Sequence, residues 1–450
     1  MSKNNSIQRK ETLKLTEWEL ANLHLPPVTT VTLYEGSAPV GFLRRRVANM
    51  LEKNPWLTSR IVKKDTTDGV VAISYTKGFD AQSATEEHFS VYEPEEIGLS
   101  LSMPYEELVR CLLPVQCSRS KPATDENEVL FKVAVVPVEP ENVSADQTMP
   151  LQQTITSPGF ALVVSMNHTL GDGHTYYHLY NMLDADTRVE EFNPVRISDF
   201  EAAKTEIIGE KETALLSSTG LAFGIIGTYF GAKFSRRGPQ NILVNEVNSA
   251  WVTAKKVEAS TEAQVPFVSS NDVLTSWFFS EMNSDINLML VNLRERQPSV
   301  LDLSDKHVGN YEANLPLFPG DIESPALIRQ SIRSTDGTFR VKRAGAPETE
   351  APGLLKLLRN RTSIITNWAT FYRDVNLQNK AQENGESVIK PKLHFPVMEP
   401  DGIITSVWNN AIVFRPRAGE LGILMITRHF DNATFARENG MNSPLGNRIM

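Results

Sequence analysis

The chain has 450 residues, of which 41% are hydrophobic and 22% are charged, and its formal net charge is −9. This length exceeds what one hydrophobic core usually supports, so we expect about two domains, and the composition excludes a disordered chain. No basic run occurs beyond Arg44-Arg45-Arg46, which argues against nucleic acid as a partner, although a local basic patch can still bind a phosphorylated ligand.

The cysteines and the N-terminus favour a reducing, cytoplasmic location. Cys111 and Cys117 are too few for a disulfide framework or a zinc-thiolate site. Residues 1–15 are polar and lack an apolar signal core, so we interpret them as a tail. Asn167-His168-Thr169 is formally a glycosylation sequon, but a glycan there would cover the candidate base described below.

The first elements are predicted from apolar spacing. Val40–Leu51 has the period of a helix, and Asn54-Pro55 ends it. The apolar runs 70–75 and 130–136 predict strands. Residues 137–158 are rich in Pro, Glu, Gln and Thr, which predicts a surface loop.

A nearly continuous apolar run, Phe160–Met166, predicts a strand that is buried on both faces, and a glycine-rich turn follows it. A helix is expected from Thr175 to about Ala185. In the second half, a Ser or Asn near Ser270 is expected to cap an apolar helix. Further strands are predicted at 288–293, 405–413 and 421–426.

The alternation of strands and helices predicts an α/β or α+β protein with mixed sheets. We divide the chain into an N-terminal domain, 1–190, a crossover or linker, 191–245, and a C-terminal domain, 246–450. No short-period internal repeat is present.

Thr213–Ala232 is a stretch of uncharged residues within the crossover. Its length is borderline for a membrane span, and Ser, Thr and Gly make it weakly hydrophobic, so a buried helix or crossover segment is favoured. The basic residues Lys233, Arg236 and Arg237 keep open a peripheral membrane contact through 213–237 or a contact with an acceptor channel.

The segment after the buried strand carries the chemistry. His168 lies directly at the strand exit, and Asp172 follows between Gly171 and Gly173 on what is expected to be a tight loop. An imidazole at a strand exit projects into a cleft and accepts a proton near neutral pH, as the attack of a hydroxyl or amine on a carbonyl requires. Asp172 either fixes the turn or orients the imidazole.

Other interpretations of this segment remain. His174 and His178 would share a helix face and could bind a metal with His168 and Asp172, but the glutamate of the zinc protease motif is missing, and we expect no metal. The residues could also be ordinary polar positions of a loop and a helix. No Gly-x-Ser-x-Gly, Gly-x-Gly-x-x-Gly or Gly-Lys-Ser/Thr motif supports hydrolase, nucleotide-dependent redox or kinase chemistry.

The segment Asn167–Gly173 resembles the His-x-x-x-Asp-Gly signature of the chloramphenicol-acetyltransferase-like superfamily, and Asn167 before the histidine makes it more similar to the BAHD and alcohol acyltransferases than to condensation domains. Other short segments resemble the family's elements in the same order and extend the likeness over most of the chain. These are Leu51–Arg60, Ser270–Leu274, Asn292–Arg296 and Gly309-Asn310.

One departure is clear, because the BAHD Asp-Phe-Gly-Trp-Gly motif is absent. The nearest candidate is Asn367-Trp368 followed by Asp374–Leu377. The family's aspartate pairs with an arginine for structural reasons, so we link Asp374 with Arg294 or Arg296.

The resemblance implies two similar α/β domains with a channel between them and His168 midway along it. An acyl thioester, most often acyl-CoA, would enter from one face and a small alcohol or amine from the other. His168 would be the general base, and Asp172 and Gly173 would support the loop. Ser270 and Asn310 are candidate substrate-binding donors to the oxyanion.

We therefore expect an acyl-CoA-dependent O-acyltransferase, or an N-acyltransferase, acting on a hydrophobic acceptor, with no permanently bound cofactor and as a monomer. One alternative is a catalytically inactive binding protein of the same fold. The other is a condensation-type enzyme that takes its acyl group from a carrier protein.

Overall fold

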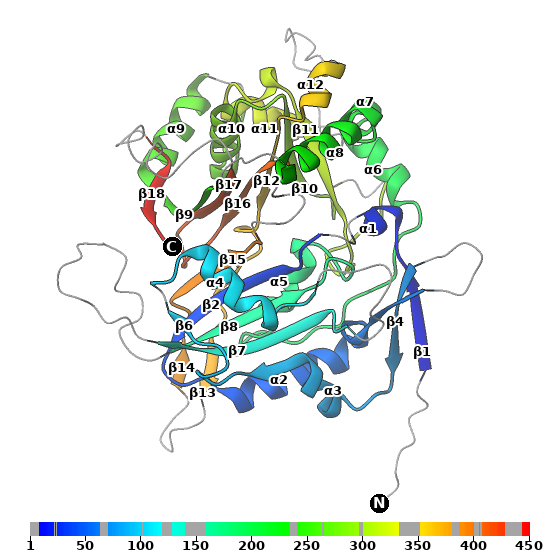
Figure 1. The fold of residues 1–450 in the computed structure, drawn as a ribbon, viewed down its shortest axis with the longest axis vertical. Helices are drawn as coiled ribbons and strands as arrows, with labels where there is room; N and C mark the ends of the chain where they lie inside the picture. Colours follow the sequence, from blue (N-terminus) through cyan, green and yellow to red (C-terminus); the bar gives the residue numbers. More distant parts are fainter. Residues whose placement is uncertain are drawn as a thin grey trace, which may run out of the picture.

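The computed structural model describes residues 9–21, 23, 25–63, 71–100, 102–118, 128–139, 159–234, 241–262, 265–296, 300–332, 352–379, 387–399, 405, 407–427 and 443–450. Two mixed sheets dominate it, each with helices packed on it (Figure 1). The expected tail is corrected in part, because β1 (Arg9–Lys14) pairs with β4 (Val71–Lys77) in a three-stranded sheet with β3 (Arg60–Lys63). Of the expected loop 137–158, residues 140–158 lie outside the described residues.

The N-terminal sheet is built around the apolar runs seen in the sequence. Its main strand order is β15-β2-β8-β7-β5, and β6 pairs with β7. The strands are β2 (Val28–Glu35), β5 (Phe89–Val91), β6 (Leu99–Ser100), β7 (Phe131–Glu139), β8 (Gly159–Met166) and β15 (Leu393–Val397). In Figure 1 the late strand β15 lies beside the early strand β2, with which it pairs antiparallel.

Alternation along β8 explains its continuous apolar run, because each face packs into a different core. Leu162 and Val164 belong to one core with residues of α2 (Val40–Lys53), which ends at the expected Asn54, and of α5 (Gly173–Asn181). Ala161 and Val163 belong to a second core, which includes α4 (Tyr105–Leu112) and strands of the C-terminal sheet. The strand predicted at 160–166 is therefore confirmed, and α3 (Ala81–His88) packs beside α2.

The C-terminal sheet has the order β11-β10-β12-β16-β17-β9-β18. Its strands are β9 (Asn241–Val247), β10 (Ile286–Asn292), β11 (Glu312–Leu317), β12 (Thr362–Asn367), β16 (Asn409–Phe414), β17 (Gly422–Thr427) and β18 (Leu445–Arg448). A small hairpin, β13 (Leu377–Asn379) with β14 (Ser387–Ile389), completes the strands that the structure describes.

Helices cover both faces of the C-terminal sheet. One face packs against α6 (Phe200–Ile208), α9 (Ser249–Glu262), α10 (Ser270–Met282) and α11 (Pro325–Ile332). The other carries α7 (Glu210–Leu216), α8 (Thr219–Phe234) and α12 (Leu354–Arg359) around Ile286 and Leu288, while its remaining part packs toward the N-terminal sheet. The two sheets thus share one continuous core, which fixes the loop after β8 between them.

The expected burial of Thr213–Ala232 is wrong for one face of the segment. It forms two helices, α7 and α8, and the large side chains Phe223, Ile226 and Phe230 are at least half exposed. The cap of α10 is Ser269, which forms a capping box with Asp272, so Ser270 is the first helical residue instead.

Candidate active site

His168 lies on the loop that joins β8 to α5. The loop is a tight turn, since Leu170 N donates to Asn167 O at 3.0 Å and the Asn167 side chain accepts from Thr169 N at 2.9 Å. The His168 side chain keeps partial exposure while its neighbours Asn167 and Thr169 are buried. The apolar strand is therefore followed by one polar residue that is only half-buried.

Asn310 holds His168 at two points. Asn310 Nδ2 donates to the His168 carbonyl at 2.6 Å, and Asn310 Oδ1 lies 3.3 Å from His168 Nδ1. The first bond fixes the orientation of the amide, so the oxygen that faces the ring can only accept. His168 Nδ1 must then carry the proton, and Nε2 keeps its lone pair.

The same surroundings keep the imidazole neutral. Burial lowers the pKa of His168, and the Asn310 hydrogen bond and the Asp172 charge offset this only in part. A neutral ring with a free lone pair on Nε2 is the form in which histidine accepts a proton.

Both carboxylate oxygens of Asp172 accept hydrogen bonds that hold the loop in place. Its Oδ1 accepts from Thr175 N at 2.9 Å and so caps α5, which therefore begins at Gly173 and not at the expected Thr175. Its Oδ2 accepts from Arg294 Nη1 at 2.7 Å and from Tyr311 N at 3.0 Å. Burial raises the pKa of Asp172, but Arg294 and these hydrogen bonds outweigh it and hold that pKa at about 2.

The partner of Arg294 corrects the expected link to Asp374, because Arg294 binds Asp172 and both side chains are buried. The Arg294 guanidinium also donates to the carbonyls of His307 and Gly309. It thereby joins the loop after β8 to the segment that carries Asn310. The spacing of the two residues in the sequence gave no sign of this pair.

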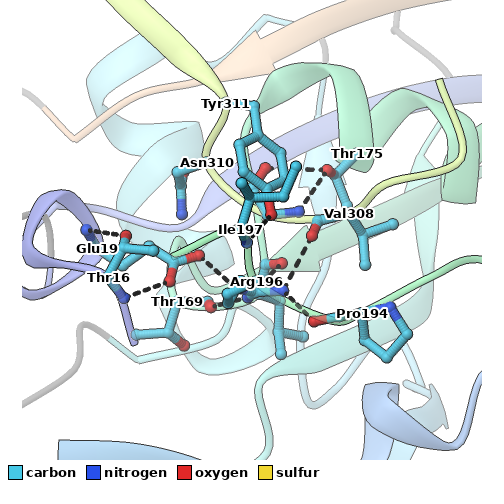
Figure 2. A network of polar contacts seen from close by, with 12 residues as sticks. Thr16, Glu19, Thr169, Thr175, Pro194, Arg196, Ile197, Val308, Asn310 and Tyr311 are labelled. Carbon is cyan, nitrogen blue, oxygen red and sulfur yellow. Dashed lines mark hydrogen bonds and ion pairs between the residues drawn. The ribbon is translucent and has the colours of Figure 1, made fainter. Parts of the chain in front are cut away.

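A second buried arginine, Arg196, fastens the opposite side of the loop (Figure 2). Its Nη2 donates to Thr169 O at 3.0 Å, its Nη1 donates to Val308 O at 2.9 Å, and its Nε lies 2.7 Å from Glu19 Oε1. Sequence reasoning missed both Arg196 and Glu19, because nothing local marks a linker arginine as buried. Their contacts fix the backbone on either side of the His168–Asn310 pair.

His174 and His178 lie together on α5, as their spacing predicts. Their Nε2 atoms are 3.1 Å apart, and His174 Nε2 is 3.3 Å from Asp305 Oδ1. Burial lowers the pKa of His174 to about 4. Within the described part of the chain, no group of three or more His, Cys, Asp or Glu side chains could hold a metal ion.

A cavity of about 670 Å³ opens beside the start of α5. It is lined by Asp172, Gly173 and His174 but not by His168, so this cavity lies next to the loop and not around the imidazole. Ser270, at the start of α10, lines the cavity, while Asn310 does not. The two predicted oxyanion donors therefore lie apart, Ser270 at the cavity and Asn310 beside His168.

Charged side chains give this cavity a mixed electrostatic character. Four arginines line it together with Glu312: Arg294, which is paired with Asp172, and Arg296, Arg329 and Arg415. Burial and the nearby Asp172 charge raise the pKa of Glu312 to about 8, although Arg294 opposes them. The lining therefore combines cations with a carboxyl group that its surroundings make harder to ionise.

Comparison with known proteins identifies the fold. TRI101 of F. sporotrichioides, solved with coenzyme A and T-2, superposes with a TM-score of 0.57 at 13% identity, covering 98% of this chain and 100% of that one. TRI101 of F. graminearum, solved with coenzyme A and deoxynivalenol, gives 0.56 at 13%, with the same coverage. The first condensation domain of the CDA synthetase gives 0.51 at 12%, covering 99% and 98%.

No protein-family model matches the chain, and the search of curated sequences found no match. The structural likeness spans nearly the whole chain, so the expected two-domain chloramphenicol-acetyltransferase-like fold is confirmed. At this identity the likeness establishes the fold and leaves the chemistry to the site itself.

Proposed function

We propose that this chain transfers an acyl group from an acyl-CoA thioester to the hydroxyl or amine of a small acceptor, with His168 as the general base. The observation that carries the proposal is the double contact of Asn310 with His168, which leaves Nε2 as the proton acceptor. The fold supports it, because structures of this fold have been solved with coenzyme A and a small molecule together.

The reaction needs one base and no covalent intermediate on the protein. Nε2 of His168 takes the proton of the acceptor as its oxygen or nitrogen attacks the thioester carbonyl. The C–S bond then breaks, and the imidazolium returns the proton to the departing thiolate. The reaction also needs hydrogen-bond donors that stabilise the oxyanion of the tetrahedral intermediate. Ser270 at the cavity wall is our candidate for one of these donors.

Coenzyme A carries phosphates, so its site needs cations. Arg296, Arg329 and Arg415 supply them on one wall of the cavity beside Ser270. Arg329 also pairs with Asp272 at 2.6 Å, so it is held in place by α10. We therefore propose that the phosphates of the donor bind at this wall.

The decisive experiment compares His168→Ala with His174→Ala, because His174 lines the cavity and is the rival base. Free thiol release from acyl-CoA is measured with a panel of alcohols and amines, and circular dichroism confirms folding. We expect His168→Ala to lose about 10²–10⁴-fold in rate, as is typical for a general base. His174→Ala should retain most of the rate.

Full activity of folded His168→Ala would overturn the role of this residue. A loss of activity in His174→Ala alone would assign the role of general base to His174 on α5. Transfer from an acyl-carrier protein but not from acyl-CoA would favour the condensation-type alternative. An absence of turnover with both donors would favour a binding protein of the same fold.

A further inference from the structure

The surface formed by α8 and α12 is unusual for a protein helix pair, because its apolar residues face outward. On α8, Phe223, Ile226 and Phe230 are 66%, 50% and 51% exposed. Their spacing of three and four residues puts them on one helix face. Scattered exposed apolar residues are ordinary, but an aligned stripe of large ones is not.

Glycines of α8 let α12 pack closely against it, and exposed leucines of α12 extend the apolar stripe. A Cβ at Gly224 would lie 2.2 Å from Leu357 O, and one at Gly220 would lie 3.1 Å from Leu354 Cδ1. The two helices therefore pack at a distance that only glycine permits. Leu354, which is 63% exposed, is placed directly beside α8, and Leu355 and Leu358 continue the surface at 76% and 45% exposure.

Charge on α12 and the residues directly after it is positive. The segment from Leu354 to Arg361 contains Lys356, Arg359 and Arg361 and no acidic residue. Asp285, 3.8 Å from Lys356, offsets one of these charges. Since the whole chain has a net charge of −9, attraction to an anionic surface has to come from such a local cluster.

The segment that forms α7 and α8 also has the composition of a membrane-contacting segment. By length and composition alone, Glu210–Phe230 is apolar enough to cross a membrane, although it is divided between α7 and α8. An 18-residue window in this range has a mean hydropathy of 1.3, and only 22% of that window is buried in the protein. No residue of α8 lines the cavity beside α5, so the acceptor-channel contact that the sequence left open has no support there. In Figure 1, α7 and α12 lie at the end of the molecule opposite to α2 and α3.

We propose that the α8–α12 surface, defined by Phe223, Ile226, Phe230, Leu354, Leu355 and Leu358, docks the protein on an anionic lipid bilayer. The apolar side chains would enter the interface between headgroups and acyl chains, and Lys356 and Arg359 would contact lipid phosphates. A second copy of the chain is the less favourable occupant, because a symmetric contact would oppose the same basic residues to each other.

The test uses the full chain and sedimentation with two kinds of vesicle, phosphatidylcholine alone and phosphatidylcholine mixed with phosphatidylserine. We expect binding to both and stronger binding to the mixture. The triple variant Phe223→Ser/Ile226→Ser/Phe230→Ser should lose at least about tenfold in vesicle affinity, since each large apolar side chain contributes that order of partitioning. Val388→Ser, at another exposed apolar position, is the matched control.

A second variant separates charge from apolar insertion. Lys356→Glu/Arg359→Glu should reduce binding to the anionic mixture and leave binding to phosphatidylcholine unchanged. The proposal is overturned if the folded wild type binds neither vesicle, or if the triple variant binds as well as the wild type. It is also overturned if the triple variant only converts a dimer to a monomer in sedimentation velocity. None of these readouts depends on the acyltransferase reaction.

Discussion

Asp172 and Arg294, 122 residues apart in the chain, form a buried ion pair at 2.7 Å between the start of α5 and the end of β10. Each comes from a different half of the molecule, and each also holds backbone of the active-site loop. The pair therefore couples the position of His168 to the packing of the two domains.

Removing one partner of this pair leaves a buried charge without compensation. We expect Arg294→Met to lower the free energy of unfolding by about 3–5 kcal/mol, measured by urea denaturation. Lys255→Ala, which breaks the exposed pair with Glu258, should change it by about 1 kcal/mol or less. Equal effects of the two variants would contradict the structural role of the Asp172–Arg294 pair.

The pH dependence of stability should carry the signature of Asp172. Its pKa of about 2 in the folded protein lies below the value of about 3.9 expected in the unfolded chain. The stabilisation that ionised Asp172 gives to the folded state is therefore present above about pH 4, and it is lost as the pH falls from about 4 to about 2. Asp172→Asn should flatten this part of the stability curve. An unchanged slope would show that other carboxylates govern acid unfolding.

Asn310→Ala tests whether the Asn310 amide sets the pKa of His168 or only packs beside it. The hydrogen bond that His168 Nδ1 donates to Asn310 Oδ1 raises the pKa of His168 against the effect of burial, so its loss should lower that pKa further. The base must be neutral to act. In the pH profile of kcat/KM, the acidic limb should therefore move to lower pH, and the plateau value of kcat/KM should fall. A purely structural role would lower the plateau without moving the limb.

Glu312 should make the protein less stable at high pH. Its pKa of about 8 lies above the value of about 4.3 expected in the unfolded chain, so the folded state binds this proton more tightly. Stability should fall as pH rises between these values, and Glu312→Gln should remove that fall. Thermal melting of both proteins at pH 5 and pH 9 measures it, and parallel curves would argue against the assignment.

Two glycines of α8 provide a matched pair for the α8–α12 packing. Gly224→Ala has to displace the Leu357 carbonyl, so we expect a loss of about 1–3 kcal/mol. A Cβ at Gly227 meets nothing within 4 Å, so Gly227→Ala should stabilise the helix by about 0.5–1 kcal/mol. Urea denaturation compares them, and similar values for both would mean that the close packing is not required.

Much of the fold was predictable because local patterns set it. The apolar run of β8, the helix α2 and the turn at Asn54-Pro55 each follow from spacing within a few residues. The placement of His168 at a strand exit follows from the same patterns. The boundary of β16 was less accurate, since the strand begins at Asn409 and not at Thr405.

What the sequence did not reveal depends on contacts between distant segments. Nothing near Arg294 distinguishes Asp172 from Asp374 as its partner, and nothing near Arg196 indicates that it would be buried with Glu19. The outward stripe of α8 was missed for another reason. In an uncharged helix both faces look apolar, so periodicity cannot tell which of them faces the solvent.

The pairing of β15 with β2 also bears on how the chain folds as it is synthesised. The edge of the N-terminal sheet stays unpaired until residues 393–397 have left the ribosome, long after the rest of that sheet has emerged. An open edge of this kind templates aggregation. We therefore expect a fragment that ends at residue 247 to be less soluble than the full chain, which its share in the soluble fraction after expression measures.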